Sequence, residues 1–315
     1  MRTTAAIAAL AAAGTAHAQA PETLALIAAA RADVATSAKD VWPGWDRTPF
    51  GVLLVEGERE HLVCQQAPGF GAPVRDAATG CEIMSRARVF PPGLQAAMPA
   101  FGLPATVVVG TPAATGKSRG GWRTMLLHEH FHQHQWTFPG YQARVAALDL
   151  SGGDETGMWM LNYAFPYAEP ETGRLFAEAS NVLAAILAKR TPPDSVDVAR
   201  YLRARDRLAA SVSPRDWRYA ELQLWQEGVA RWTEFTAAER SQDPDVAETG
   251  RALHAATGRE LIAARLAEDR RLALYALGAS EATLLERCGS RWRARYPVVV
   301  SMRPLLAAAL EDCRR

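Results

Sequence analysis

The chain has 315 residues, of which 49% are hydrophobic and 22% are charged. This is the composition of an ordinary globular protein with enough residues for a sizeable core. Its 35 basic and 34 acidic residues nearly balance, whereas nucleic-acid-binding proteins usually carry a basic excess. No apolar run reaches the roughly 18 residues that a membrane-spanning helix needs. We therefore expect neither a nucleic-acid partner nor a membrane span.

Residues 1–20 are predicted to be a secretory signal peptide. Met1 and Arg2 precede an apolar stretch over residues 5–13, and small residues alternate over residues 16–20. This is the layout of a signal peptide and its cleavage site. The alternative interpretation is an alanine-rich helix of the folded domain. We expect an exported protein, periplasmic or secreted, and exclude these residues from the predicted fold.

The four cysteines form two pairs that are close in the sequence. Cys64 lies near Cys81, and Cys288 lies near Cys313. An oxidising compartment favours disulfides, and an even number of cysteines permits complete pairing. We expect the two local bridges, Cys64–Cys81 and Cys288–Cys313; four buried free thiols are the alternative.

The order of predicted elements indicates an α+β fold. Spaced apolar residues predict a helix over residues 22–41. Short segments rich in Val, Leu and Ile, between Gly and Pro turns, then predict strands over residues 51–56, 61–65, 82–89 and 106–110. After Gly121 helical periodicity predicts helices over residues 122–136, 141–149, 173–190, 195–210, 214–240, 245–256, 258–277 and 301–311. Residues 21–121 are thus expected to form an N-terminal helix and β-sheet region, and residues 122–315 a helical region of the same continuous domain.

The chemistry is predicted to lie in His128-Glu129-His130-Phe131-His132, which contains the pattern H-E-x-x-H. On a helix, histidines at positions i and i+4 lie on one face, so both imidazoles can bind one metal ion. Zinc suits such ligands, and Glu129 is placed to act as a general base toward a water molecule at the metal. His130 and His134 are expected on other faces of the helix.

A catalytic zinc site needs a third protein ligand. Glu227 is the best candidate, because Leu222, Trp225, Val229 and Trp232 form an apolar stripe that leaves Glu227 on another face of the predicted helix. Gly228 follows directly and lets the backbone approach another helix closely. Asp154 and Glu155, nearer in sequence to the histidines, are the competing candidates.

H-E-x-x-H followed much later by Glu227-Gly228-Val229-Ala230 resembles the gluzincin zinc metallopeptidases, and the stretch Tyr275–Gly278 is similar to the helical tail of uncharacterised secreted bacterial members. The resemblance implies a zincin-like catalytic region in which His128, His132 and Glu227 bind zinc and Glu129 is the general base. It also suggests Tyr275 as the donor to the oxyanion, with core packing as the alternative role. No G-x-M-E-N motif for binding an amino terminus is found, so internal peptide cleavage is expected.

Residues 110–118 superficially resemble a phosphate-binding loop. The first glycine of that motif would have to stand at Thr111, and Gly110 is one position early. We therefore interpret the segment as a loop before the motif helix.

The sequence thus predicts a zinc metallopeptidase, binding one Zn²⁺ per chain and acting on a peptide or protein. A different zinc hydrolase and a non-catalytic zinc-stabilised binding protein are the alternatives. Peptidases commonly hold an extended substrate against a sheet edge. Thr106–Gly110 is the candidate edge strand, although its apolar run also fits a buried central strand.

Overall fold

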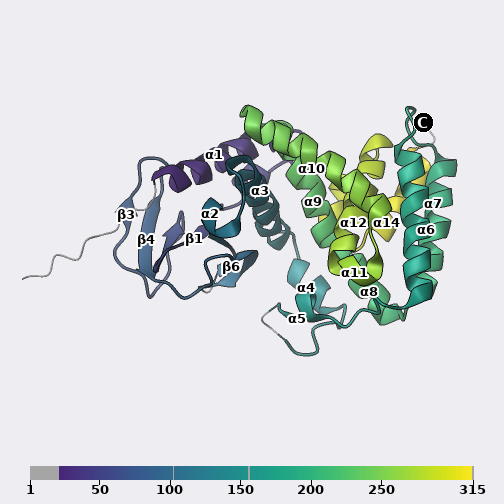
Figure 1. The fold of residues 1–315 in the computed structure, drawn as a ribbon, viewed down its shortest axis with the longest axis horizontal. Coiled ribbons are helices and arrows are strands. Elements are labelled where there is room, and N and C mark those ends of the chain that lie inside the picture. Colours follow the sequence, from purple (N-terminus) through teal and green to yellow (C-terminus); the bar gives the residue numbers. More distant parts are fainter. Residues whose placement is uncertain (1–20, 102, 155–156, 314–315) are drawn as a thin grey trace, which may run out of the picture.

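The computed structural model describes residues 21–313 except 102, 155 and 156 (Figure 1). The predicted signal peptide lies outside the described residues. Among the helices described, none is long and apolar enough to cross a membrane. A sheet occupies one end of the molecule and a helical region the other, which confirms the predicted α+β class.

Six strands form one sheet in the order β3-β4-β2-β1-β6-β5. β1 and β6 are parallel, with Val52 opposite Val107, and every other neighbouring pair is antiparallel. β5 and β3 are therefore the two edge strands. The strands are β1 (Val52–Glu56), β2 (Arg59–Val63), β3 (Val74–Arg75), β4 (Glu82–Ala87), β5 (Gln95–Ala100) and β6 (Leu103–Gly110).

The central strands are buried on both faces, which explains their continuous apolar sequence. Leu54 of β1 and Val107 and Val109 of β6 face the main core beneath the helices. Leu53 and Val108, on the opposite face, belong to a smaller core covered by loops. Thr106–Gly110 is therefore central, and the prediction of an edge strand there is wrong.

Helices make up nearly all of the structure beyond the sheet. α3 lies between the sheet and the helices α9 and α10, while α6 and α7 lie at the far end (Figure 1). The helices are α1 (Pro21–Ser37), α2 (Pro112–Thr115), α3 (Arg119–Trp136), α4 (Tyr141–Ala146), α5 (Trp159–Asn162), α6 (Pro170–Leu187), α7 (Ser195–Ala210), α8 (Pro214–Gln223), α9 (Val229–Ala238), α10 (Pro244–Ala263), α11 (Leu266–Asp269), α12 (Arg271–Arg287), α13 (Trp292–Arg295) and α14 (Arg303–Asp312), with 3₁₀ turns η1 (Trp45–Arg47) and η3 (Tyr296–Val298) and a π-helical turn η2 (Leu224–Gly228).

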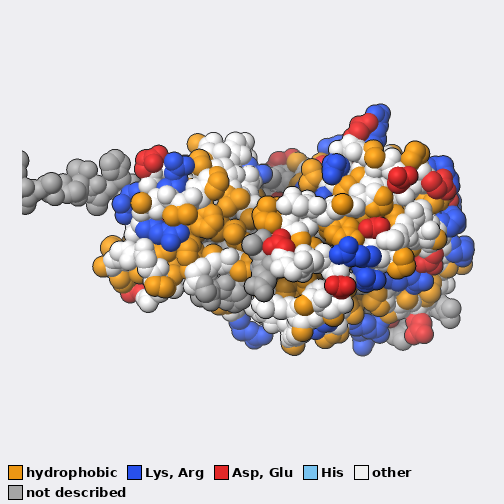
Figure 2. Space-filling model, turned by 90° about the horizontal axis from the view of Figure 1, so that it is seen from below, with side chains coloured by type: hydrophobic (Ala, Val, Ile, Leu, Met, Phe, Trp, Pro, Cys, Tyr) orange, Lys and Arg blue, Asp and Glu red, His pale blue; other side chains and the backbone are white. Residues whose placement is uncertain are grey.

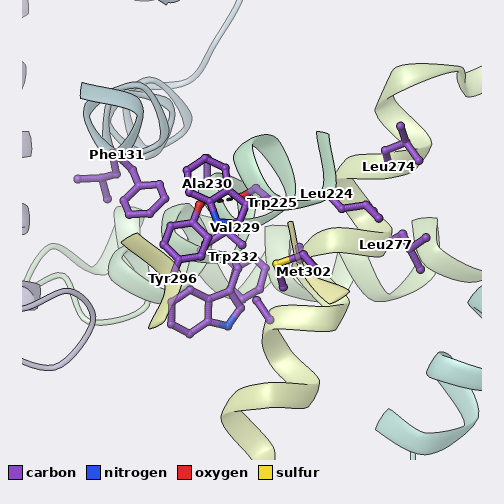
Figure 3. Close-up of a cluster of buried hydrophobic side chains, with 14 of the residues drawn as sticks. Phe131, Leu224, Trp225, Val229, Ala230, Trp232, Leu274, Leu277, Tyr296 and Met302 are labelled. Carbon is purple, nitrogen blue, oxygen red and sulfur yellow. Dashed lines mark hydrogen bonds between the residues drawn. The ribbon is translucent and has the colours of Figure 1, made fainter. Parts of the chain in front are cut away.

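Large aromatic side chains fill the core where α3, η2 and α9 meet (Figure 3). Trp225 of η2 stacks on Tyr296 with ring centroids 4.5 Å apart. The Tyr296 hydroxyl donates to the Trp225 carbonyl oxygen at 2.7 Å, and Trp225 is fully buried. The predicted apolar stripe of this segment is therefore core, and it fixes the orientation of the turn that carries Glu227.

The π-helical turn η2 contacts α12 backbone to backbone. A Cβ atom on Gly228 would lie 2.5 Å from the Gly278 Cα atom, and one on Gly278 would lie 2.9 Å from the Gly228 Cα atom. Real Cβ atoms do not approach other atoms this closely. The close approach expected at Gly228 is present, and it requires a second glycine on the opposing helix.

Two disulfides and a buried ionic network add further links. The bridges are Cys64–Cys81 and Cys288–Cys313, the local pairs that the sequence predicts. In the helical region Arg205 is fully buried and pairs with Glu221 at 2.5 Å and Glu281 at 2.6 Å. This network joins α7, α8 and α12.

Several element boundaries differ from the predictions. β5 was not predicted, because Gln95–Ala100 contains no β-branched or aromatic residue. A helix break was expected at residue 257, but α10 continues to Ala263, since a single glycine such as Gly258 lowers helix propensity without ending a helix. The chain turns instead between Ala264 and Arg270.

Candidate metal centre

The motif helix α3 presents two histidines at one point. Its first turn is capped by Ser118, whose Oγ accepts from the Gly121 N–H. His128 and His132 follow two turns later, both buried, with their Nε2 atoms 3.1 Å apart. The i, i+4 spacing therefore brings the two imidazoles to a common centre.

Glu227 reaches the same centre from η2. Its Oε2 atom lies 3.5 Å from His128 Nε2 and 3.3 Å from His132 Nε2. Within the described residues these three side chains form the one group of His, Cys, Asp and Glu whose ligand atoms all lie within 4.8 Å of one another. A π-helical turn often marks a functional position, because the extra residue changes where the following side chains point.

The three donor atoms have the spacing of a zinc site. Tetrahedral zinc with ligand distances of about 2.1 Å has ligand atoms about 3.4 Å apart. The observed separations are 3.1, 3.3 and 3.5 Å. Two imidazole nitrogens and one carboxylate oxygen are also a ligand set of catalytic zinc. The residues present therefore fit this metal.

Both imidazoles are oriented through their other nitrogen. His128 Nδ1 lies 3.2 Å from Glu234 Oε2, and His132 Nδ1 lies 2.7 Å from Gln135 Oε1. The Gln135 amide in turn donates to the carbonyl oxygen of Gln226 at 2.9 Å. Such partners fix the tautomer and direction of metal-binding histidines.

The roles of Glu234 and Gln135 were not predicted. Glu234 lies seven residues after Glu227, two helical turns along, and Gln135 lies three residues after His132. These spacings were the available signal, since residues separated by one or two turns share a helix face.

The centre combines a cationic imidazole with two carboxylates. Burial alone would lower the pKa of His128, but hydrogen bonds with Glu227 and Glu234 raise it to about 10. Burial alone would raise the pKa of Glu227, but the charge of His132 and hydrogen bonds with both histidines hold it well below its usual range. A divalent cation would supply the same positive charge between the two carboxylates, and its binding would displace the His128 proton.

Glu129 lies beside the centre without belonging to the ligand group. It is buried, and burial raises the pKa of its carboxyl group above the ordinary value. A hydrogen bond from the main-chain N–H of Ala97, in edge strand β5, lowers the pKa of the same carboxyl group and so offsets part of this rise. The motif glutamate therefore lies between the candidate ligands and the sheet edge.

Tyr275 comes to the centre from α12. Its ring is nearly parallel to the His128 imidazole, with centroids 6.3 Å apart. Burial raises the pKa of the Tyr275 phenol well above 10, and the negative charge of Glu227 adds to that effect. The phenol therefore keeps its proton and can donate a hydrogen bond at neutral pH.

The competing ligand candidates lie elsewhere or outside the described residues. Asp154 accepts a hydrogen bond from the Trp159 N–H at 2.8 Å and is not part of the ligand group. Glu155 is outside the described residues.

The two further histidines of α3 face away from the centre. His130 stacks on Phe50 with centroids 4.1 Å apart, and burial lowers its pKa to about 3. His134 lies 2.7 Å from Thr48 Oγ1, and burial lowers its pKa to about 4. Both are therefore neutral packing residues.

Comparison of the chain with protein-family models, with curated proteins and with solved structures gave no match. The functional argument accordingly depends on the donor triangle of His128, His132 and Glu227 and on the groups around it.

Proposed function

We propose that the protein is a zinc-dependent peptidase, exported to the periplasm or the medium, in which His128, His132 and Glu227 hold the metal. The observation that carries the proposal is the donor triangle, with edges of 3.1, 3.3 and 3.5 Å, together with Glu129 buried beside it. The two disulfides support export, because such bridges persist in oxidising compartments.

The residues around the donor triangle supply proton transfer and charge stabilisation. Bound zinc lowers the pKa of a water molecule and polarises a carbonyl group. Glu129, with its raised pKa, takes a proton from the attacking water and delivers it to the leaving amine. Tyr275 remains protonated and donates to the oxygen on which negative charge develops.

The substrate backbone is expected along β5. This edge strand has β6 on one side only, and its Ala97 N–H faces the Glu129 carboxyl group. A peptide paired with a sheet edge lies extended and exposes its carbonyl groups in sequence. Internal cleavage, with no requirement for a free amino terminus, is the mode this arrangement supports.

A zinc-stabilised binding module and a hydrolase of other amides or esters share the ligand set. Glu129 argues against the binding module, because a purely structural site has no use for a buried carboxyl group that is not a ligand. Peptide and ester substrates distinguish the two hydrolase classes.

The test combines zinc analysis with hydrolysis of N-terminally blocked peptides. The wild type should bind about one zinc per chain. His132→Ala and Glu227→Ala should lose it, whereas the matched controls His134→Ala and Asp154→Ala should keep it. Glu129→Gln should retain zinc and lose hydrolysis by a factor of about 10² to 10⁴.

Two outcomes would contradict the proposal. Equal zinc in wild type and His132→Ala would exclude the metal site. Hydrolysis of small esters with no cleavage of any peptide would exclude the peptidase while retaining the zinc hydrolase.

A further inference from the structure

Arg271 lies against the side of the metal centre formed by α12. Its Nη1 atom is 3.4 Å from Glu227 Oε1, the carboxylate oxygen other than the one nearest the histidines. Its guanidinium group also lies over the Tyr275 ring, 5.2 Å from the centroid. The arginine therefore contacts both a candidate metal ligand and the candidate oxyanion donor.

Most of the hydrogen-bonding capacity of Arg271 is unused. A guanidinium group has five N–H donors, and Glu227 is its one hydrogen-bond partner among the described residues. The distance of 3.4 Å is long for a charge-assisted hydrogen bond, which is usually about 2.7–2.9 Å. The side chain is 23% exposed, so part of the guanidinium group is open to solvent.

The buried Arg205 is a useful comparison, because its role is structural. Its guanidinium group makes four hydrogen bonds, to Glu221 and Glu281, at distances from 2.5 to 3.5 Å. Burying a cation without partners is costly, and Arg205 has them. Arg271 is partly exposed and has a single long contact, which leaves most of its N–H donors for a bound molecule.

Arg270 adds a second cation beside Arg271. Its guanidinium group lies over the Tyr167 ring, 5.1 Å from the centroid, and the residue is exposed. The acidic residues just before it, Glu268 and Asp269, are both engaged by Arg265. Seen from below, the helical part of the molecule carries several Lys and Arg side chains with Asp and Glu side chains among them (Figure 2).

We propose that Arg271, assisted by Arg270, binds a carboxylate of the substrate close to the scissile bond. The planar guanidinium fork matches a carboxylate in a bidentate pair, which a neutral amide cannot form equally well. Arg271 is one side chain away from the metal centre, so the recognised group is near the reacting carbonyl. The carboxylate is an acidic side chain where cleavage is internal, as proposed above, and the free carboxyl terminus where the enzyme instead cuts close to the end of the peptide. This inference rests on the proposed peptidase function.

Binding to zinc-loaded Glu129→Gln protein tests the inference without relying on turnover. Calorimetry would compare N-acetylated tetra-alanine peptides carrying Glu or Gln at one internal position, all with amidated carboxyl termini. A second arm would compare acetyl-tetra-alanine as free acid and as amide. In one arm the acid should bind about tenfold tighter than its amide. The arm that shows the preference identifies the source of the carboxylate.

Three variants assign the preference to a residue. Arg271→Gln should reduce the acid-to-amide ratio to about one, and Arg270→Gln should reduce it partly. Arg259→Gln, the matched control, removes an equal charge from an exposed position on α10 and should keep the ratio. If Arg271→Gln does not fold, Arg271→Lys retains the charge but loses the fork, and it should bind with a smaller ratio.

The inference is overturned if neither arm shows an acid preference, or if Arg271→Gln keeps it. A variant that loses zinc affinity while the ratio is unchanged would show that Arg271 only positions Glu227, which also overturns it. Cleavage of acidic and neutral peptides at equal rates would leave the peptidase standing and remove the carboxylate site. An acid preference without cleavage of any peptide would support the carboxylate site and exclude the peptidase.

Discussion

The sheet and the helices contribute to the candidate metal centre in different ways. Every candidate ligand is a side chain from a helical element, with His128 and His132 on α3 and Glu227 on η2. The sheet approaches the centre through the edge strand β5, where the hydrogen bond from the Ala97 N–H lowers the pKa of Glu129. Under the proposed function the sheet wall would hold many peptide sequences, because its main-chain groups are present whatever the side chain. The helical wall, formed by α3, η2 and α12, would supply the chemistry.

The two regions also differ in what fixes their geometry. Neighbouring strands are joined by hydrogen bonds between backbones, whose donors and acceptors are present at every residue except proline. The helical wall depends on two glycines in contact, Gly228 and Gly278, and on an aromatic core beneath η2. Substitutions in the helical region should therefore have the larger effects.

Gly278→Ala should give the largest loss of stability. The new Cβ would meet the Gly228 backbone at 2.9 Å, so α12 and η2 would have to separate, at a cost of about 3 kcal/mol. Zinc affinity should fall as well, because η2 carries Glu227. The matched control is Gly258→Ala, where no atom lies within 4 Å and helix propensity predicts a gain of up to about 1 kcal/mol. Denaturant unfolding measures both, and equal effects would refute the close-contact argument.

Glu234→Ala should weaken zinc binding about ten- to hundredfold. The substitution removes the carboxylate that holds His128 Nδ1 at 3.2 Å while all three candidate ligands remain. Glu239→Ala, at the residue that follows α9, removes a carboxylate that pairs with His254 and should leave zinc affinity unchanged. Competition with a chelator gives the two affinities. Unchanged affinity in Glu234→Ala would show that the orientation of His128 is fixed by other contacts.

The sheet wall can be probed through its main chain at Ala97. Ala97→Pro removes the N–H that acts on Glu129, whereas Ala97→Ser retains it at a similar side-chain size. Proline is tolerated in edge strands, so the fold and the zinc content should persist. We expect kcat/KM for peptides to fall about tenfold in the proline variant only, the effect of roughly one hydrogen bond. An equal loss in the serine variant would mean that the side chain, not the backbone, contributes at this position.

Local spacing made one half of the centre predictable. The geometry of an α-helix alone brings His128 and His132 together, so the motif predicts their proximity without any tertiary information. Glu227 lies 95 positions further on. Its placement depends on η2, α12 and the aromatic core, but the apolar stripe and Gly228 were sufficient to nominate it.

Other parts depend on contacts that the sequence does not encode locally. β5 has low strand propensity and exists because β6 offers an unpaired edge. Arg271 lies near Glu227 only because Gly228 and Gly278 bring η2 and α12 into contact. The π-helical turn likewise has no simple signal in the sequence. Elements of this kind follow from the packing of the whole chain.

The smallest expected effect concerns a histidine inside the sheet. His61 of β2 is buried and lies 2.8 Å from Ser85 Oγ. Burial, together with the charge of Arg59, lowers its pKa from 6.5 to about 4. Between these values the unfolded chain binds more protons than the folded one, so stability is complete above pH 6.5 and declines toward pH 4.

This one group can change the free energy of unfolding by at most about 1.4 kcal/mol per pH unit within that window. His61→Gln keeps a polar partner for Ser85 but does not titrate. It should reduce the slope between pH 6.5 and 4 by the share of His61, while the buried His130 and His134, whose pKa values are also lowered, keep theirs. Denaturant unfolding at three pH values provides the measurement. Parallel slopes for wild type and His61→Gln would show that the acid sensitivity of the protein arises outside the sheet.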